Sequence, residues 1–129
     1  TLEDAVDTVL AACFNCEGGE VFIPQIKSYD METILEAIEA LHGSSIDYTT
    51  IGLRPGEKLH EDMLAETELP FTYKVPGINL LCVRPQYTNR SHNQGWKKYT
   101  GPHFNSSLHV SKDLSSLVSL ITRGAQEIN

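Results

Sequence analysis

The stretch Ile51–Glu61 constrains the fold most, because a Pro-Gly pair at its centre interrupts any helix or strand that would run through it. An apolar run precedes the pair. Further apolar residues follow it at helical spacing, namely Leu59, Met63 and Leu64. The sequence therefore predicts a strand end, a turn at Pro55-Gly56 and the start of a new helix, with Arg54 at the corner.

Arg54 and Glu57 have the side chains that a nucleotide diphosphate site requires. Arginine carries a permanent planar charge that suits phosphate oxygens, and the start of a following helix would add backbone N–H donors. Glu57, three residues later, can accept hydrogen bonds from two ribose hydroxyls. Spacing alone leaves a second interpretation open, in which these charges lie in a solvated turn and only cap the helix.

The residues Arg54–Glu61 read Arg-Pro-Gly-Glu-Lys-Leu-His-Glu, which resembles a signature of bacterial polysaccharide-biosynthesis nucleotide-sugar dehydratases. These are the UDP-N-acetylglucosamine 4,6-dehydratases, a group within the extended short-chain dehydrogenases. Residues 1–66 carry most of the resemblance. Four other segments are similar to parts of that family: Thr1–Asp7, Gly18–Pro24, Tyr99–Gly101 and Asn105–Ser107.

The resemblance implies an α/β fold that forms the C-terminal substrate-binding part of an extended short-chain dehydrogenase. It implies that Arg54 contacts the pyrophosphate of a UDP-sugar and Glu57 the ribose hydroxyls, with Lys58 and His60 as secondary binding residues. The implied partners are the UDP-sugar, the N-terminal Rossmann domain of the parent enzyme and, in some cases, further copies in a homo-oligomer. The parent would use NADP or NAD.

The catalytic half of that family has no counterpart in these 129 residues. A Gly-x-x-Gly-x-x-Gly turn is missing, and none of the five tyrosines has a lysine four residues later. The chain also begins at Thr1 inside a predicted helix. We therefore expect a chain without the Rossmann core, with no catalytic residue and no bound cofactor of its own, cut from a longer dehydratase or epimerase.

Two other functions remain open at this stage. The chain could be a stand-alone module that binds nucleotide sugars without chemistry, or an oligomerisation module that has kept the fold and lost the ligand. A Gly-rich turn and a Tyr-x-x-x-Lys pair encoded upstream would favour the parent enzyme, whereas a failed ligand titration would favour oligomerisation.

Composition limits the remaining classes of function. A chain of 129 residues with 40% hydrophobic residues can form one domain with a modest core. Its net charge of −7 argues against nucleic acid and anionic membrane surfaces, which require basic fields. No apolar run approaches the roughly 18 residues that span a bilayer. The expected location is the cytoplasm.

Hydrophobic periodicity divides the chain into four predicted parts. Residues 1–66 are predicted as α-β-α-β-α, with helices near 2–13, 30–41 and 57–66 and strands near 21–23 and 46–53. The first helix is expected to turn an apolar face inward, made of Leu2, Val6, Val9, Leu10 and Cys13. Ser28 or Asp30 can cap the second helix. Residues 67–84 are predicted as a β-hairpin around Pro76-Gly77, and residues 85–109 as a long polar loop. Residues 110–124 are predicted as a terminal helix capped by Ser111 and stopped by Gly124.

The cysteines and histidines favour structural roles over metal binding. Cys13 and Cys16 have C-x-x-C spacing but lack a second pair, and Cys82 lies in an apolar run typical of a buried strand. Three histidines in or near the long loop fit no usual zinc spacing. These are His92, His103 and His109.

A basic and aromatic group lies in the same part of the chain. Its members are Arg84, Arg90, Lys97 and Lys98, with Trp96 and Tyr99 beside them. Such a group can stack a uracil ring or hold a phosphate, but it is more often part of a solvated loop.

Overall fold

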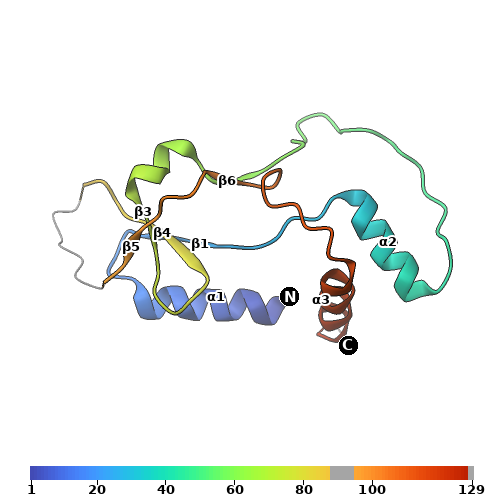
Figure 1. Cartoon of the computed structure of the whole chain (residues 1–129), viewed down its shortest axis with the longest axis horizontal. Coiled ribbons are helices and arrows are strands. Elements are labelled where there is room, and N and C mark those ends of the chain that lie inside the picture. The colour runs from blue at the N-terminus through green and yellow to red at the C-terminus, as the bar shows by residue number, and fades with distance from the viewer. Residues whose placement is uncertain (88–94, 128–129) are drawn as a thin grey trace. The chain divides into compact units, whose positions relative to one another are not determined.

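The computed structural model describes residues 1–87 and 95–127 (Figure 1). These residues fall into two compact units. Unit 1 contains residues 1–2 and 27–61 and the chain from residue 106 onward. Unit 2 contains residues 3–26 and 62–105. Helices and strands are both present, so the structure confirms the predicted mixture of helix and sheet.

Unit 2 is built on a four-stranded antiparallel sheet. Its strands are β1 (Val21–Pro24), β3 (Thr72–Lys74), β4 (Leu80–Val83) and β5 (Lys97–Lys98), arranged in the order β1-β4-β3-β5. The apolar run of β4 lies between two partners, where a strand buried on both faces is expected. β3 and β4 flank the predicted turn at Pro76-Gly77, where Gly77 has a φ of 76°.

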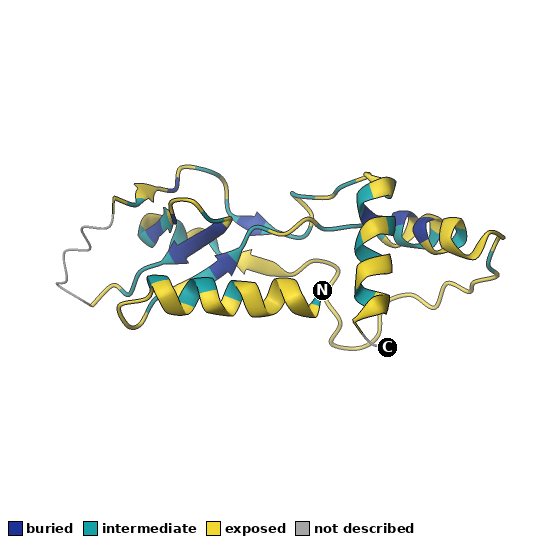
Figure 2. Cartoon of the chain, turned by 90° about the horizontal axis from the view of Figure 1, so that it is seen from below, coloured by how far each residue is buried: buried dark blue, intermediate teal, exposed yellow. Residues whose placement is uncertain are grey.

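Both faces of this sheet are covered by apolar side chains. Leu81 belongs to a cluster with Ile23, Leu64, Tyr99 and Phe104 on one face. Leu80 and Cys82 belong to a second cluster with Val75 on the other face. Successive residues of β4 thus enter different clusters, as the alternation of side chains along a strand requires. Figure 2 shows this burial concentrated on the strands.

The helix α1 (Leu2–Asn15) has the predicted position in the sequence but not the predicted contact face. Leu2, Val6, Val9 and Leu10 were expected to point inward, yet each is about half exposed or more, and Cys13 is exposed. The second cluster is contacted by Ala11 instead. Figure 2 accordingly shows α1 as largely exposed.

A second sheet, of two strands, pairs two segments of unit 2 that are far apart in the sequence. β2 (Asp62–Leu64) pairs antiparallel with β6 (Phe104–Asn105). Between β2 and β3 lies the 3-10 helix η1 (Glu66–Phe71). The Glu68 carboxylate accepts a hydrogen bond from the N–H of Ala65 at 2.9 Å, which caps the start of η1.

Unit 1 contains the helices α2 (Met31–His42) and α3 (Leu114–Gln126), which pack against each other. Asp30 caps α2 by accepting from the N–H of Thr33 at 2.9 Å, so of the two predicted caps, Ser28 and Asp30, the structure has Asp30. Gly43 ends α2 in the left-handed conformation with a φ of 77°. Ala37 and Leu117 supply buried apolar side chains on the two helices.

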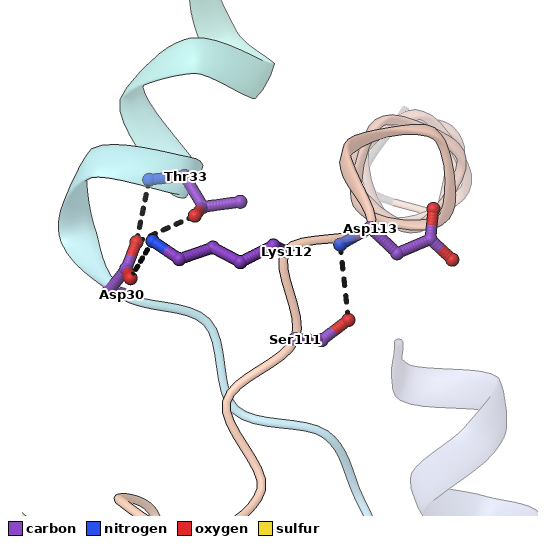
Figure 3. Close-up of polar contacts among 5 residues, drawn as sticks. All are labelled: Asp30, Thr33, Ser111, Lys112 and Asp113. Atoms are coloured by element: carbon purple, nitrogen blue, oxygen red, sulfur yellow. Dashed lines mark hydrogen bonds and ion pairs between the residues drawn. The ribbon is translucent and has the colours of Figure 1, made fainter.

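Asp30 also connects the starts of α2 and α3 within unit 1 (Figure 3). Its carboxylate accepts from the Thr33 hydroxyl at 2.6 Å and forms an ion pair with Lys112. The hydrogen bond to Lys112 and the two to Thr33 hold the pKa of Asp30 far below its usual range, and Asp30 in turn raises the pKa of Lys112. Asp113, the next residue, caps α3 through the N–H of Ser116 at 3.0 Å.

Two predicted elements around the Arg54 turn are wrong. Residues 46–53 form no strand, and the helix predicted over 57–66 is missing, since only Glu66 lies in a helix, at the start of η1. Within the described residues no partner strand lies along 46–53, and an unpaired segment cannot complete a ladder. Leu64 enters β2 opposite Phe104, and both side chains are buried. This long-range pairing overrides the helical spacing of the local sequence.

The C-terminal part differs from prediction in two further respects. Asp113 rather than Ser111 caps the last helix, and Gly124 lies within that helix instead of ending it. The predicted long loop contains β5 and β6, because Tyr99 and Phe104 beside and within these strands are buried in the core. Residues 88–94 of that loop, including Arg90 and His92, lie outside the described residues.

Across residues 1–87 and 95–127, no helix has both the length and the apolar character needed to cross a membrane.

Candidate functional site

The Arg54 turn is present and is closed by two reciprocal hydrogen bonds. The N–H of Glu57 donates to the carbonyl of Arg54 at 3.0 Å across Pro55-Gly56. The N–H of Arg54 donates to the Glu57 Oε2 atom at 2.8 Å. Gly56 has a φ of 84°, a conformation that favours glycine. The two residues predicted to bind ligand are therefore brought together, and the glutamate also stabilises the turn.

The cationic side chains of this turn extend into solvent. Arg54, Glu57 and Lys58 are all exposed in unit 1. The Arg54 guanidinium and the Lys58 ammonium make no hydrogen bond or ion pair with any residue in 1–87 or 95–127. Both cations are consequently available to an anion that approaches the turn.

No helix dipole supports this site, contrary to the expectation. The backbone after the turn continues through bends to β2, so the predicted N-terminal N–H donors of a helix are missing here. An anion at this position would be bound by side-chain charge and by the local backbone of the turn.

His60, the fourth predicted site residue, contacts a residue from a distant part of the sequence. Its Nδ1 atom lies 3.2 Å from the hydroxyl oxygen of Ser106. The same hydroxyl accepts from the N–H of Glu61 at 3.1 Å, while the N–H of Ser106 donates to the Glu61 carbonyl at 3.0 Å. Ser106 thus holds the C-terminal end of the signature segment.

Ser106 was missed as a site residue by sequence reasoning. The segment Asn105–Ser107 was recognised only as similar to the family's C-terminal tail. Ser106 and Glu61 are 45 residues apart in the sequence, and no local sequence pattern encodes a contact between them.

The basic and aromatic group has a structural role in unit 2. The Arg84 guanidinium lies 4.1 Å from the ring centre of Tyr73 and 5.1 Å from that of Trp96. Trp96 also packs edge-on against Phe22, and Lys98 lies 4.7 Å above Tyr73. These ring faces are occupied by cations of the chain itself, so the hypothesis that they stack a uracil ring gains no support.

The remaining titratable residues show no arrangement for metal binding. In the described ranges, no three His, Cys, Asp or Glu side chains converge on a common point where an ion could sit. Cys13 and Cys16 are exposed, whereas Cys82 is fully buried, and burial raises the pKa of its thiol to about 12. The prediction that Cys82 is a small buried hydrophobic residue is confirmed.

A cavity of about 340 Å³ lies in unit 2 beside the start of β1 and the end of β4. Its lining includes Val21, Phe71 and Val83, and none of the four predicted binding residues. The cavity therefore adds nothing to the case for the Arg54 turn.

Several known proteins are similar to part of this chain. A UDP-N-acetylglucosamine 4,6-dehydratase (inverting) of Campylobacter jejuni is 36% identical over 74 residues, which are 57% of this chain and 21% of that enzyme. A UDP-glucose 4-epimerase of Rickettsia felis is 30% identical over 69 residues, or 54% of this chain and 20% of that protein. An uncharacterized membrane protein of Methanocaldococcus jannaschii is 37% identical over 76 residues, which are 54% of this chain and 23% of that protein. The matched part is about a fifth of the length of these relatives.

The fold is also similar to a solved structure. The X-ray structure of Pen from Bacillus thuringiensis matches with a TM-score of 0.72 and 26% sequence identity. The match covers 95% of this chain and 36% of Pen. The arrangement of helices and strands described above therefore recurs within a longer protein.

The family model for polysaccharide biosynthesis proteins matches residues 1–81. This range includes the whole Arg54–Glu61 signature, and it confirms the resemblance that the signature indicated. Since the match covers more than half of the 129 residues, this chain belongs to the polysaccharide biosynthesis protein family.

Proposed function

We propose that this chain is the UDP-sugar-binding region of a nucleotide-sugar dehydratase or epimerase, and that Arg54 and Glu57 bind the UDP group. Two similar enzymes support this proposal. The Campylobacter jejuni enzyme is named for UDP-N-acetylglucosamine and the Rickettsia felis enzyme for UDP-glucose. The two names differ in sugar and in reaction, and UDP is what they share.

The observation that carries the proposal is the closed turn between Arg54 and Glu57. The turn fixes the backbone of Arg54 while its guanidinium has no partner among the described residues, so a diphosphate can be met by a positioned cation. One oxygen of Glu57 accepts the Arg54 N–H, and the other oxygen can accept a ribose hydroxyl. Lys58 would add positive charge beside the phosphates.

UDP titration by calorimetry tests this assignment. Loss of a charged hydrogen-bond partner costs on the order of 1.5–3 kcal/mol, so Arg54→Ala should weaken UDP binding by about ten- to hundred-fold. Arg54→Lys keeps the charge but loses the planar fork, and should give an intermediate affinity. Lys27→Ala is the matched control, because it removes another exposed cation of unit 1. Equal UDP affinity in wild type and Arg54→Ala would contradict the proposal.

In this proposal the chemistry and the cofactor belong to the rest of the parent enzyme. NADP or NAD needs a Gly-rich strand-to-helix turn that lets its pyrophosphate approach the backbone, and the sequence contains none. The residues of this chain therefore do not fit the cofactor. The isolated chain, incubated with UDP-N-acetylglucosamine and NADP, should form no 4-keto-6-deoxy product on chromatography. Product above a no-protein control would show that the chain itself is catalytic.

The alternative is a module that binds nucleotide sugars or assembles copies of itself without catalysis. A failed UDP titration would favour the oligomerisation module over both ligand-binding proposals. A Gly-rich turn and a Tyr-x-x-x-Lys pair in the upstream coding sequence would favour an enzyme fragment over a stand-alone binder. The cytoplasmic location stays a prediction, since one similar protein carries the name of a membrane protein.

A further inference from the structure

The hydroxyl of Ser106 lies between two groups of the signature segment. It accepts a hydrogen bond from the Glu61 N–H at 3.1 Å and lies 3.2 Å from His60 Nδ1. The backbone N–H of Ser106 donates to the carbonyl of Glu61 at 3.0 Å, which fixes the serine from a second direction. All three residues belong to unit 1, so the contacts lie within one compact part of the structure.

The Ser106 hydroxyl can contact His60 Nδ1 as donor or as acceptor, depending on the tautomer of the ring. A serine hydroxyl has one proton to donate and two lone pairs to accept with. One lone pair of Ser106 is used by the Glu61 N–H. Among the residues that the structure describes, the Ser106 proton meets no acceptor other than His60 Nδ1. The arrangement that uses this proton is donation from Ser106 to the ring.

This direction fixes the tautomer of a neutral ring. An imidazole nitrogen that accepts a hydrogen bond carries no proton, so the proton of neutral His60 must lie on Nε2. The ring then presents an N–H donor on the side away from Ser106. His60 is exposed and belongs to the same compact unit as Arg54, so that donor is open to a ligand that binds at the signature segment.

We propose that Ser106 is a positioning residue of the UDP-sugar site: it orients His60 and holds its proton on Nε2, so that His60 donates to a phosphate oxygen. This proposal rests on the proposed function, because it requires UDP to bind at the Arg54 turn. It adds a residue outside the signature and a specific atom of His60 to that site.

The first test needs no ligand. The ¹⁵N chemical shifts of the His60 ring nitrogens, measured at about pH 8.5 where imidazole is neutral, show which nitrogen carries the proton. Wild type and Ser106→Thr should have an unprotonated Nδ1, and Ser106→Ala should move toward the tautomer mixture of a free ring. A protonated Nδ1 in wild type, or ring shifts that Ser106→Ala leaves unchanged, would overturn the inference.

The second test uses UDP affinity and variants that mimic one nitrogen each. Glutamine places an amide N–H near the position of Nε2, whereas asparagine places its amide near Nδ1. His60→Gln should therefore retain UDP binding, and His60→Asn should weaken it by about tenfold. Ser106→Ala should weaken UDP binding by about three- to tenfold, with recovery in Ser106→Thr.

Ser44→Ala is the matched control for these variants. It removes a serine that makes the same kind of contact, at 2.7 Å, with Nδ1 of His42 in the same unit. UDP affinity should be unchanged in this control. If UDP binds wild type and Ser106→Ala equally, the positioning role is wrong while the proposed function stands. If wild type does not bind UDP, both fail.

Discussion

Asp30 and Lys112, 82 residues apart in the sequence, form an ion pair that connects the starts of α2 and α3. Asp30 is the N-cap of α2, and Lys112 immediately precedes Asp113, the N-cap of α3. One carboxylate thus caps one helix while it binds the chain that enters the other, as Figure 3 shows. The Arg54 turn belongs to the same unit as these helices.

The first prediction concerns the acid stability of unit 1. The pKa of Asp30 is lowered in the folded state, so its charge stabilises that state above about pH 4, and the contribution is lost as the pH falls further. Asp30→Asn keeps an oxygen that can cap α2 but removes the charge. Between about pH 5 and about pH 2, the protection factors of amides in α2 and α3, which are exchange rates relative to the intrinsic rate at the same pH, should therefore fall more in wild type than in Asp30→Asn.

Lys112→Met provides the reciprocal variant for this experiment. It removes the partner of Asp30 and should reduce the acid dependence of the protection factors in the same helices. The contribution of the ion pair is also expected to fade as the pH rises through the raised pKa of Lys112. An acid dependence identical in wild type and both variants would show that the pair does not stabilise the helix starts.

The second prediction concerns the core of unit 2. Leu81 is completely buried in the central strand β4, so Leu81→Ala should lower the free energy of unfolding by about 2–5 kcal/mol. Leu10→Ala is the matched control, since Leu10 of α1 is 49% exposed and should cost less than about 0.5 kcal/mol. Denaturant titration followed by the fluorescence of Trp96, the single tryptophan, measures both changes. Similar losses for the two variants would mean that α1 packs through the leucine face.

The third prediction concerns the three cysteines. Cys13 and Cys16 are exposed, whereas Cys82 is buried and its pKa of about 12 leaves almost no reactive thiolate near neutral pH. A thiol reagent should therefore modify two sites rapidly in the native chain and the third only after addition of denaturant. Mass spectrometry of the labelled peptides identifies the sites. Rapid native labelling of Cys82 would contradict the burial of β4.

The elements that could be predicted from the sequence are those whose local sequence signals agree with the tertiary contacts they make. Asp30 and Gly43 mark the two ends of α2 through capping chemistry that depends only on adjacent residues. Pro76-Gly77 separates two apolar runs, and the runs pair as β3 and β4. In these cases the local preference and the tertiary contacts agree.

The errors arose where a distant partner decides the structure. Leu64 has helical spacing with Leu59, but it is buried opposite Phe104, 40 positions later in the chain. Periodicity showed that α1 has an apolar face but not whether that face is buried. In the structure it is largely exposed, and Ala11 contacts the core instead. For the site, local sequence identified the Arg54 turn, while the contact of Ser106 with Glu61 depends on pairing that local sequence does not encode.

The last prediction concerns the glycine of the Arg54 turn. Gly56 has a φ of 84° with no atom within 4 Å of an added Cβ, so Gly56→Ala would strain the backbone without a steric clash. A left-handed conformation costs a residue with a Cβ roughly 1–2 kcal/mol, and stability should fall by up to about that amount.

Gly124→Ala is the control for the same chemical change. Gly124 lies within α3 with open space around it, where alanine should raise stability by roughly 0.5–1 kcal/mol. Denaturation midpoints that shift in opposite directions would support the turn geometry. If Gly56→Ala proves as stable as wild type and binds UDP equally well, the left-handed turn is not what positions Arg54.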